Sequence, residues 1–583
     1  MGQTKKKINK MEKIEKLKNS FKKYNLDGYL IPKNDEFFSE YVPHHKDDLQ
    51  YISNFSGSYG LALILKNKNY LFVDGRYTIQ ANIQSGKTFN IVTLPLVKNK
   101  KSLNIKNKKI GYDPRLFNEK SLKKISEKLG SKFISVEKNL IRSLKGEKKY
   151  NIKNKYFYVL DTSITGQSNL KKINNLKKYV YKSNVDIMFV TSSENIAWLL
   201  NIRGNDSDYS PIPNCFLIID KNMKIFLFCD LKKINIEFKR KLNFIRILGI
   251  DELENFLKKI KGKKFLLDNI TCSIFYKDLI KKKNSILEKN DPIYLLKSQK
   301  NKIEIDNIKK IHEYDGAALT KFLIWIKNNF KRRKISELSA QKKLLKFRKK
   351  FNNFKSLSFP TISSTGSNGA VVHYNATNKT NKVLKSGNIY LVDSGGQYHF
   401  GTTDVTRTIS LNSKSKKIKE VFTKVLQGHL NLSNYKLNKN TTGSILDIIA
   451  RKELKKINLD YAHGTGHGVG YFLNVHEGPQ SISKSNQTTF KPGMILSNEP
   501  GYYEKGKYGL RIENLIYVKK IKNGIKFNNL TYVPIDKSLI IKKLLNKKEI
   551  LWLNQYHQLV YNKLKKYMNK KELILLKESC SNI

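Results

Sequence analysis

Four acidic side chains in the last third of the chain stand beside apolar, strand-like runs, and they constrain the fold more than any other feature. They are Asp393, Asp404, Glu499 and Glu513. A carboxylate among β-forming residues is locally unfavourable, and one that faces inward needs a partner. The fold must therefore bring each of these carboxylates to a partner.

The first two carboxylates lie in a segment with a hairpin pattern. A strand-like run ends at Asp393 and is followed by the turn-forming residues 394–397 and by a second strand-like run. A hairpin would place Asp393 and Asp404 on neighbouring strands, and Asp404 and Thr406 would share one face because side chains alternate along a strand. The alternative is that each Asp only forms a turn, a common role for Asp beside glycine.

The other two carboxylates lie fourteen residues apart in a similar pattern. Glu499 ends an apolar run that is stopped by Pro500, and the chain resumes as a strand-like run through Arg511 and Glu513. The pattern predicts paired strands, with Arg511 and Glu513 on one face.

A glycine-rich motif between these pairs carries two histidines, in the run His463-Gly-Thr-Gly-His467-Gly-Val-Gly470. The spacing is that of helical zinc sites, but four glycines in eight residues disfavour a helix and no Glu follows the first His. The motif therefore predicts an extended loop or strand that presents imidazoles to a cleft. The alternative is a structural histidine with its hydrogen bonds satisfied.

These residues together predict a metal centre. Four converging carboxylates would repel one another strongly, and two divalent cations would resolve the repulsion. Oxygen ligands with one imidazole suit Mn(II), Co(II) or Zn(II). The four cysteines lie far apart without a CxxC pair, which disfavours a thiolate site and a disulfide scaffold.

The first half of the chain repeats one pattern twice. Strand-like runs occur at 29–31, 61–65, 70–73 and 89–93, and again at 187–190, 215–219 and 224–228. Helical patterns separate them, as at 119–130. The repetition predicts two similar mixed α/β domains, followed by a long helix over 302–329 and a glycine-rich α+β segment.

The net charge of +63 suggests a nucleic-acid partner, but its make-up disfavours one. Only twelve of the 111 basic residues are arginines. Recognition of nucleic-acid bases or phosphates favours arginine, because its planar guanidinium group can donate two parallel hydrogen bonds. Residues 356–515, which hold the predicted site, carry 20 Lys and Arg against 10 Asp and Glu. We therefore expect weak polyanion attraction at most and no dedicated nucleic-acid site.

The remaining sequence features concern where in the cell the protein is located. The start, Met1-Gly-Gln-Thr-Lys-Lys-Lys7, lacks an apolar h-region, and Lys6 stands where myristoylation needs Ser or Thr. No apolar stretch reaches the roughly 18 residues that a membrane span needs. These features predict a cytoplasmic protein with no membrane contact.

The ordered pattern of carboxylates and His467 resembles the metallopeptidase family of pita-bread fold, which includes methionine aminopeptidases, prolidases and X-Pro aminopeptidases. The flanking motifs resemble in particular the three-domain cytosolic X-Pro aminopeptidases (aminopeptidase P). These motifs are residues 356–374, 401–408, 463–479 and 499–503, with Asp74–Tyr77, Trp198–Gly204 and Trp552–His557 in other parts of the chain. The resemblance covers nearly the whole sequence.

The resemblance implies a domain layout. Two creatinase-like α/β domains would precede a pita-bread catalytic domain, and a carboxy-terminal extension would pack on the catalytic domain. The expected boundaries are 1–148, 149–300, 301–520 and 521–583.

The resemblance also implies the metal ligands. Asp404 and Glu513 would bridge two divalent ions, with manganese as the first candidate and cobalt and zinc as the others. Asp393 would complete one metal site, and His467 with Glu499 the other. A metal-bridging hydroxide would attack the scissile carbonyl, with Glu499 as general base or proton relay.

Three further histidines are expected in catalysis and substrate binding by the same resemblance. His373 and His476 would line the pocket for the proline ring. His463 would contact the substrate carbonyl or the tetrahedral intermediate. The alternative for each is that it orients a metal ligand.

Three other side chains are expected near the substrate. Tyr503 would shape the pocket on the proline side or pack in the core. Arg511 would pair with a bridging carboxylate or with the substrate. Arg76, far away in the first domain, would reach the cleft across a domain interface.

The main functional hypothesis is an enzyme that hydrolyses the bond between any N-terminal residue and a penultimate proline. A prolidase, which cleaves only dipeptides, is the nearest alternative, and the two preceding domains favour the aminopeptidase. A non-catalytic protein that binds polyanions is the alternative from another class, which the complete ligand set disfavours. The family also implies a homodimer.

Overall fold

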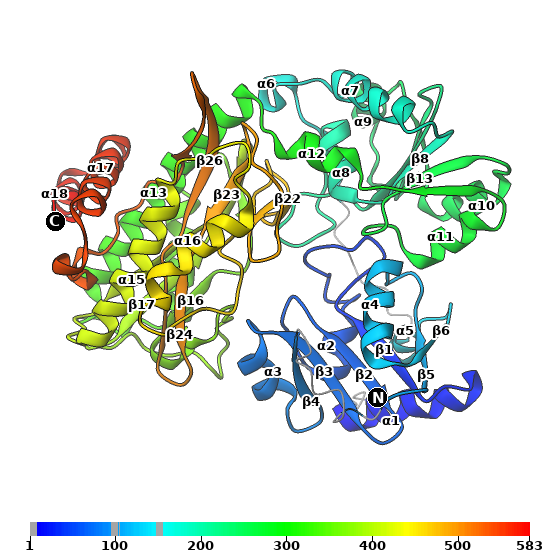
Figure 1. Cartoon of the computed structure of the whole chain (residues 1–583), viewed down its shortest axis with the longest axis horizontal. Coiled ribbons are helices and arrows are strands. Elements are labelled where there is room, and N and C mark those ends of the chain that lie inside the picture. Colours follow the sequence, from blue (N-terminus) through cyan, green and yellow to red (C-terminus); the bar gives the residue numbers. More distant parts are fainter. Residues whose placement is uncertain (1–8, 95–102, 104, 147–154) are drawn as a thin grey trace, which may run out of the picture. The chain divides into compact units, whose positions relative to one another are not determined.

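The computed structural model describes residues 9–94, 103, 105–146 and 155–583 (Figure 1). The amino-terminal basic run and the expected boundary between residues 148 and 149 lie outside these ranges. The chain divides into two compact units. The first comprises 1–160, 168–208 and 212–293, and the second comprises 161–167, 209–211 and 294–583.

The first unit begins with a six-stranded sheet of order β4-β3-β2-β1-β5-β6. Its strands are β1 (Gly28–Pro32), β2 (Leu61–Leu65), β3 (Asn69–Asp74), β4 (Asn90–Leu94), β5 (Lys109–Tyr112) and β6 (Lys132–Ser135). Strands β1, β2 and β3 pair antiparallel, and the remaining neighbours pair parallel. The predicted strands of this region are confirmed, within one or two residues at each end.

A second sheet in the same unit repeats this topology. Its order is β12-β11-β10-β8-β13-β14, with the same sequence of parallel and antiparallel pairs. Its strands are β8 (Ile187–Val190), β10 (Cys215–Asp220), β11 (Ile225–Cys229), β12 (Arg246–Gly249), β13 (Lys264–Leu267) and β14 (Ser285–Glu288). A short pair, β7 (Tyr158–Val159) and β9 (Ile202–Arg203), lies outside the sheet. The predicted repetition of an α/β domain is thus confirmed.

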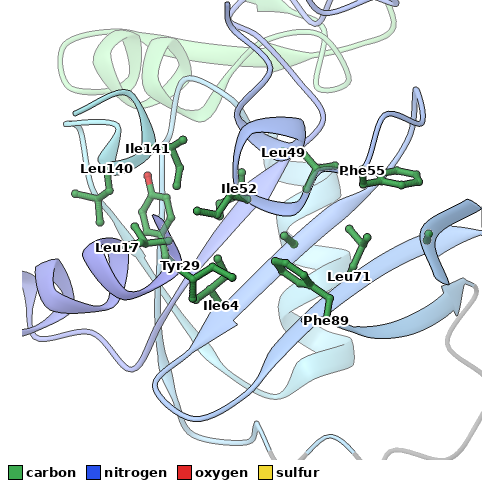
Figure 2. Packing of buried hydrophobic residues seen from close by; sticks show 14 of the residues in the cluster. Leu17, Tyr29, Leu49, Ile52, Phe55, Ile64, Leu71, Phe89, Leu140 and Ile141 are labelled. Carbon is green, nitrogen blue, oxygen red and sulfur yellow. The ribbon is translucent and has the colours of Figure 1, made fainter. Parts of the chain in front are cut away.

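Amphipathic helices cover these sheets. Helix α1 (Lys10–Phe21) starts where Asn9 accepts a hydrogen bond from the backbone of Glu12, and it buries Ile14, Leu17 and Phe21 on one face. Figure 2 shows Leu17 packed with Tyr29, Ile64 and Leu140 in the first core. The other helices of this unit are α2 (Asp48–Ser53), α3 (Thr78–Ser85), α4 (Glu119–Leu129), α5 (Leu140–Lys145), α7 (Asn169–Lys182), α8 (Ser193–Leu200), α9 (Ile236–Lys241), α10 (Leu253–Lys259) and α11 (Ile274–Lys281). Helix α12 (Pro292–Ser298) contains the boundary between the two units.

The second unit is built around the predicted long helix, which spans Lys302–Asn329 as α13. Asn301 and Glu304 form a reciprocal capping box at its start, which fixes where the helix begins. The other helices of this unit are α6 (Thr162–Thr165), α14 (Glu337–Arg348), α15 (Lys416–Ser433), α16 (Gly443–Lys455), α17 (Lys547–Leu564) and α18 (Lys570–Cys580). No helix of the described residues has the length and apolar composition needed to cross a bilayer.

Four sheets complete the second unit, with strand orders β15-β18-β19, β16-β17-β20, β22-β21-β23-β26-β27 and β24-β25. The strands are β15 (Phe354–Leu357), β16 (Ile362–Thr365), β17 (Ile389–Ser394), β18 (Gly396–Tyr398), β19 (Gly401–Thr402), β20 (Val405–Ser410), β21 (Gly466–Gly468), β22 (Glu477–Ile482), β23 (Ile495–Asn498), β24 (Gly501–Glu504), β25 (Tyr508–Arg511), β26 (Asn514–Ile521) and β27 (Gly524–Asn529). The expected α/β and α+β fold class is therefore confirmed.

The predicted turn over residues 394–397 is wrong. Residues 396–398 form strand β18, which pairs with β15 and β19, so the chain leaves the β17–β20 hairpin for a second sheet before it returns. Gly395 permits the departure, because a Cβ there would lie 1.9 Å from the carbonyl oxygen of Thr403. The pairing partner Leu357 is distant in sequence, so no local pattern signals this strand.

Helices α15 and α16 cross at a glycine. Gly428 lies buried within α15, and a Cβ at this position would lie 2.1 Å from the carbonyl oxygen of Ala450 in α16. A real Cβ cannot approach backbone so closely, so the helices pack at this distance only because residue 428 has no side chain.

We predict that Gly428→Ala lowers the melting temperature by roughly 2–4 °C, although Ala is the better helix former by about 1 kcal/mol. The cost of separating two packed backbones exceeds the gain in helix propensity. Thermal denaturation followed by circular dichroism measures the change. Glu420→Ala, at an exposed position of the same helix, is the control and should not lower the melting temperature. A rise in melting temperature for Gly428→Ala would refute the close-packing argument.

Candidate functional site

Strands β17 and β20 position the two aspartates. They pair antiparallel with Asp393 opposite Thr406, and Asp404 directly precedes β20. Asp393 is buried, and its Oδ2 accepts a 2.6 Å hydrogen bond from Nη2 of Arg511. Its Oδ1 is buried without a hydrogen-bond partner among the described residues. One oxygen of Asp393 therefore remains available to a ligand.

Strands β23 and β26 position the two glutamates. Their last antiparallel pair is Asn498 opposite Asn514, so Glu499 and Glu513 are the next residues in the same register. After Glu499 the chain turns into the β24–β25 hairpin and returns to Glu513. The predicted pairing of the two strands is confirmed, but both glutamates lie one residue outside the paired strands rather than on them.

His467 lies on β21, next to β23. The predicted extended conformation of its glycine-rich motif is confirmed. Its Nδ1 lies 2.9 Å from the carbonyl oxygen of Gly468, which can only accept, so Nδ1 carries the proton. Its Nε2 lies 3.5 Å from a carboxylate oxygen of Asp404 and 3.5 Å from one of Glu499. The lone pair of Nε2 therefore faces the acidic cluster, which is the tautomer a metal ligand needs.

The cluster is electrostatically strained without a cation. Burial raises the pKa of Glu513 well above its ordinary value, and the charges of Asp404, Glu499 and Asp393 raise it further, against the opposing effect of Arg511. Asp404, His467 and Glu513 each offer one ligand atom, and these atoms lie within 4.8 Å of one another. The donor set and the unpartnered oxygen of Asp393 both fit divalent cations.

Hydrogen bonds from Arg511 and Thr406 hold the carboxylates of Asp393 and Glu513. The Oγ1 of Thr406 donates a 2.7 Å hydrogen bond to Glu513 Oε2 and accepts a 3.0 Å bond from Nε of Arg511. The predicted single strand through Arg511 and Glu513 is wrong, because β25 ends at Arg511 and β26 begins at Asn514 in another sheet, but both side chains still meet the same hydroxyl. Thr406 is fully buried, so water cannot replace its hydrogen bonds.

Tyr503 links Arg511 to His463. Nη1 of Arg511 donates to the Tyr503 hydroxyl at 2.5 Å, and that oxygen lies 3.0 Å from Nε2 of His463. Since Nδ1 of His463 donates to the carbonyl of Gly464, its Nε2 accepts the hydroxyl proton of Tyr503. Burial raises the pKa of Tyr503 to about 12 despite the neighbouring Arg511, so the hydroxyl keeps its proton.

His476 lies against the metal-ligand candidate His467, with ring centroids 4.1 Å apart, and it is exposed. The next residue, Glu477, is buried and forms ion pairs with the buried side chains of Lys300 and Lys297. This arrangement fixes the backbone that carries His476.

Two other residues, His373 and Arg76, are expected to bind substrate. His373 is half-buried and follows the short helical turn Gly366–Ala370. Arg76 lies in the first unit, where it forms a two-pronged ion pair with Asp74. Their roles in binding substrate stay predictions.

The sequence did not reveal the buried arginines that support the site. Arg451 donates to the carbonyl oxygens of Tyr461 and His463, and so holds the histidine loop. Arg407 and Arg348 are also buried beside the catalytic strands. The scarcity of arginine in this lysine-rich chain was an available signal, because buried positions favour the guanidinium group.

The fold and this site define a metal-dependent peptidase, and comparison with known proteins agrees. Residues 306–520 match the profile of metallopeptidase family M24, and 524–583 match the C-terminal region of the same peptidases. Residues 13–144 and 148–304 each match a creatinase/prolidase N-terminal domain.

Similarity extends over nearly the whole chain. Xaa-Pro aminopeptidase 1 of Dictyostelium discoideum is 36% identical over 95% of this chain and 93% of its own. A probable Xaa-Pro aminopeptidase P of Laccaria bicolor is 34% identical over 98% of this chain and 94% of its own. The protein therefore belongs to metallopeptidase family M24.

A solved structure agrees with this assignment. The X-prolyl aminopeptidase of Caenorhabditis elegans, described as a cytosolic enzyme with a dinuclear active site, superimposes with a TM-score of 0.93 and 29% identity. The match covers 99% of this chain and 100% of that one. A prolidase of Pyrococcus horikoshii, 23% identical with a TM-score of 0.51 over 62% of this chain and 99% of its own, shares the fold.

We predict that Thr406→Val lowers the affinity for Mn(II) by about tenfold, because Glu513 loses its hydroxyl donor and Arg511 loses its acceptor. Equilibrium dialysis of the full-length protein measures the affinity. Thr406→Ser keeps the hydroxyl and should bind Mn(II) within about twofold of the wild type. Equal losses in the two variants would show that the methyl group, rather than the hydrogen bonds, supports Glu513.

Proposed function

We propose that the protein is a metal-dependent X-Pro aminopeptidase, which hydrolyses the bond between the N-terminal residue of a peptide and a penultimate proline. The observation that carries this proposal is the convergence of Asp404, His467 and Glu513 in a chain whose full-length relatives are named Xaa-Pro aminopeptidases. The duplicated amino-terminal domains favour this activity over that of a prolidase.

In this proposal Asp404, Glu513, His467 and Glu499 would hold two divalent ions, together with Asp393 through its unpartnered Oδ1. When bound, the ions supply Lewis acidity and neutralise the carboxylates. Oxygen donors with one imidazole suit Mn(II) best, and Co(II) and Zn(II) also fit.

Glu499 is placed to accept and pass on a proton during hydrolysis. Its Oε1 accepts a 3.0 Å hydrogen bond from Ser497 and faces Nε2 of His467, and the side chain is only half-buried. Ser497 holds the carboxylate in one orientation, and the partial exposure lets it exchange protons with substrate or water.

His463 has a role that depends on its proton. Its Nε2 accepts from Tyr503 as the site stands, so a hydrogen bond from His463 to the substrate oxyanion requires a second proton on the ring. Tyr503 can then turn its hydroxyl proton elsewhere while it still accepts from Arg511. The pair therefore stabilises negative charge on the substrate.

The remaining residues are proposed to bind the peptide. A proline in second position has no amide N–H, so the enzyme must hold the ring and the leaving nitrogen instead. His373 and His476 serve the proline side, and Arg76 serves charged groups of the peptide, whereas Arg511 pairs with Asp393. We also propose that the enzyme is a cytoplasmic homodimer, which size-exclusion chromatography with light scattering would test for the assembly.

We predict that the metal-loaded protein cleaves X-Pro-Y tripeptides and leaves X-Ala-Y tripeptides and X-Pro dipeptides intact. Liquid chromatography of the products, with Mn(II) or with a chelator, measures this. Chelation should abolish the activity, and Mn(II) should restore it. Cleavage of dipeptides alone would identify a prolidase, and cleavage that persists in chelator would exclude a metal enzyme.

We predict that Asp404→Asn and His467→Ala each lower kcat for X-Pro-Y peptides by at least about 10³-fold, since each removes a ligand from the metal site. Steady-state kinetics at saturating Mn(II) measures this. Glu420→Ala, at an exposed position of α15 in the second unit, is the control and should keep kcat within about twofold. Near-normal kcat in either ligand variant would overturn the assignment.

A further inference from the structure

Arg407 connects the site to the carboxy-terminal part of the chain. It lies on β20, three residues after Asp404, and is almost fully buried. Its Nη1 donates to the carbonyl oxygen of Glu513 at 2.6 Å and to that of Thr406 at 2.8 Å. The guanidinium therefore holds the backbone of the two residues whose side chains meet in the Thr406–Glu513 hydrogen bond.

The other side of the same guanidinium faces the carboxy-terminal region. Its Nη2 donates to the carbonyl of Val533 at 2.8 Å and to the hydroxyl of Tyr556 at 2.7 Å, and its Nε donates to the carbonyl of Pro534 at 3.1 Å. Tyr556 belongs to α17, and its hydroxyl donates in turn to Val533 at 2.7 Å. Arg407 thus joins strand β20 to the segment after β27 and to helix α17.

The chemistry of Arg407 is unusual for a buried charge. Within the described part of the chain, each hydrogen bond that it donates goes to a neutral oxygen: backbone carbonyls, the hydroxyl of Tyr556 and the Oδ1 of Asn514. A buried cation without a carboxylate partner is costly, so its position depends on many well-aligned dipoles. Removal of one acceptor therefore leaves part of a buried charge unsatisfied.

The two histidines near Arg407 carry no charge. Burial, with the Arg407 charge, lowers the pKa of His429 to about 3, and burial lowers that of His557 to about 3, so both rings stay neutral at physiological pH. His557 accepts a hydrogen bond from the backbone of Ile535 in this neutral form. The strands and α17 are therefore joined by hydrogen bonds to Arg407 rather than by ion pairs.

We propose that Arg407 and Tyr556 are positioning residues, through which the carboxy-terminal helical region holds Glu513 and Thr406 in the geometry that binds metal. This inference rests on the proposed function, in which Glu513 helps to hold the two ions. It assigns a role in the metal site to the region after β27, whose helices carry none of the ligands. A displacement of the Glu513 backbone moves its carboxylate directly, whereas the substrate contacts are left in place.

The test compares Tyr556→Phe with Tyr561→Phe in the full-length protein. Both residues lie on α17, and both changes remove one hydroxyl, but the Tyr561 hydroxyl makes no hydrogen bond in the described part of the chain. Mn(II) binding is measured by equilibrium dialysis below the melting temperature of each variant. Stability, kcat and KM are measured in parallel. Arg407→Lys is a second variant, which keeps the positive charge but lacks the planar guanidinium group.

Tyr556→Phe is expected to bind Mn(II) about tenfold more weakly than the wild type, and Tyr561→Phe equally well. At saturating Mn(II), Tyr556→Phe should lower kcat severalfold and leave KM unchanged. Arg407→Lys, where it folds, should lose more Mn(II) affinity than Tyr556→Phe. A Tyr556→Phe variant that melts earlier but binds Mn(II) like the wild type would overturn the proposal, because its role would then be structural only.

The dialysis result is independent of the substrate. If the wild type binds Mn(II) but cleaves no X-Pro peptide, the proposed activity fails, and the comparison of the two tyrosine variants still decides the role of Tyr556. If the wild type binds no Mn(II), both proposals fail together.

Discussion

The second unit depends on one electrostatic constraint, which is the convergence of four carboxylates beside the buried guanidinium of Arg511. Arg511 contacts Asp393 directly and Glu513 through Thr406. One positive charge cannot balance four negative ones in a buried site, and the raised pKa of Glu513 expresses the deficit. Divalent cations remove it, which couples the local stability of the site to metal binding.

The surrounding architecture serves to hold these charges at a fixed separation. Asp393 is paired within β17, whereas Asp404, Glu499 and Glu513 lie directly beside strand ends, where the neighbouring sheet still fixes the backbone. Buried arginines then hold the connecting segments from outside the cluster. Arg451 holds the loop of His463, and Arg407 joins β20 to α17. The large lysine excess of the chain takes little part in this arrangement, in which Lys300 and Lys297 support Glu477.

Much of the fold and most of the acidic cluster could be predicted from local patterns. Alternating runs predicted the repeated sheets, helical spacing predicted α13, and acidic residues at the ends of strands predicted the metal centre. The detour of the chain through β18 could not be predicted, because that strand pairs with Leu357, about forty residues away. The Tyr503–His463 hydrogen bond was also hidden, since it joins strand β24 to a loop forty residues earlier in the sequence.

The sequence by itself predicted which residues would carry the chemistry, because four carboxylates beside apolar strands and an imidazole among glycines together fit a metal site. The tertiary structure decided how these residues are supported. Support comes from groups such as Arg407 and Thr406, whose partners are brought together only when separate strands and helices pack. The local sequence shows which polar or charged side chains would be costly to bury without a partner. Which residue acts as that partner depends on contacts between distant parts of the chain.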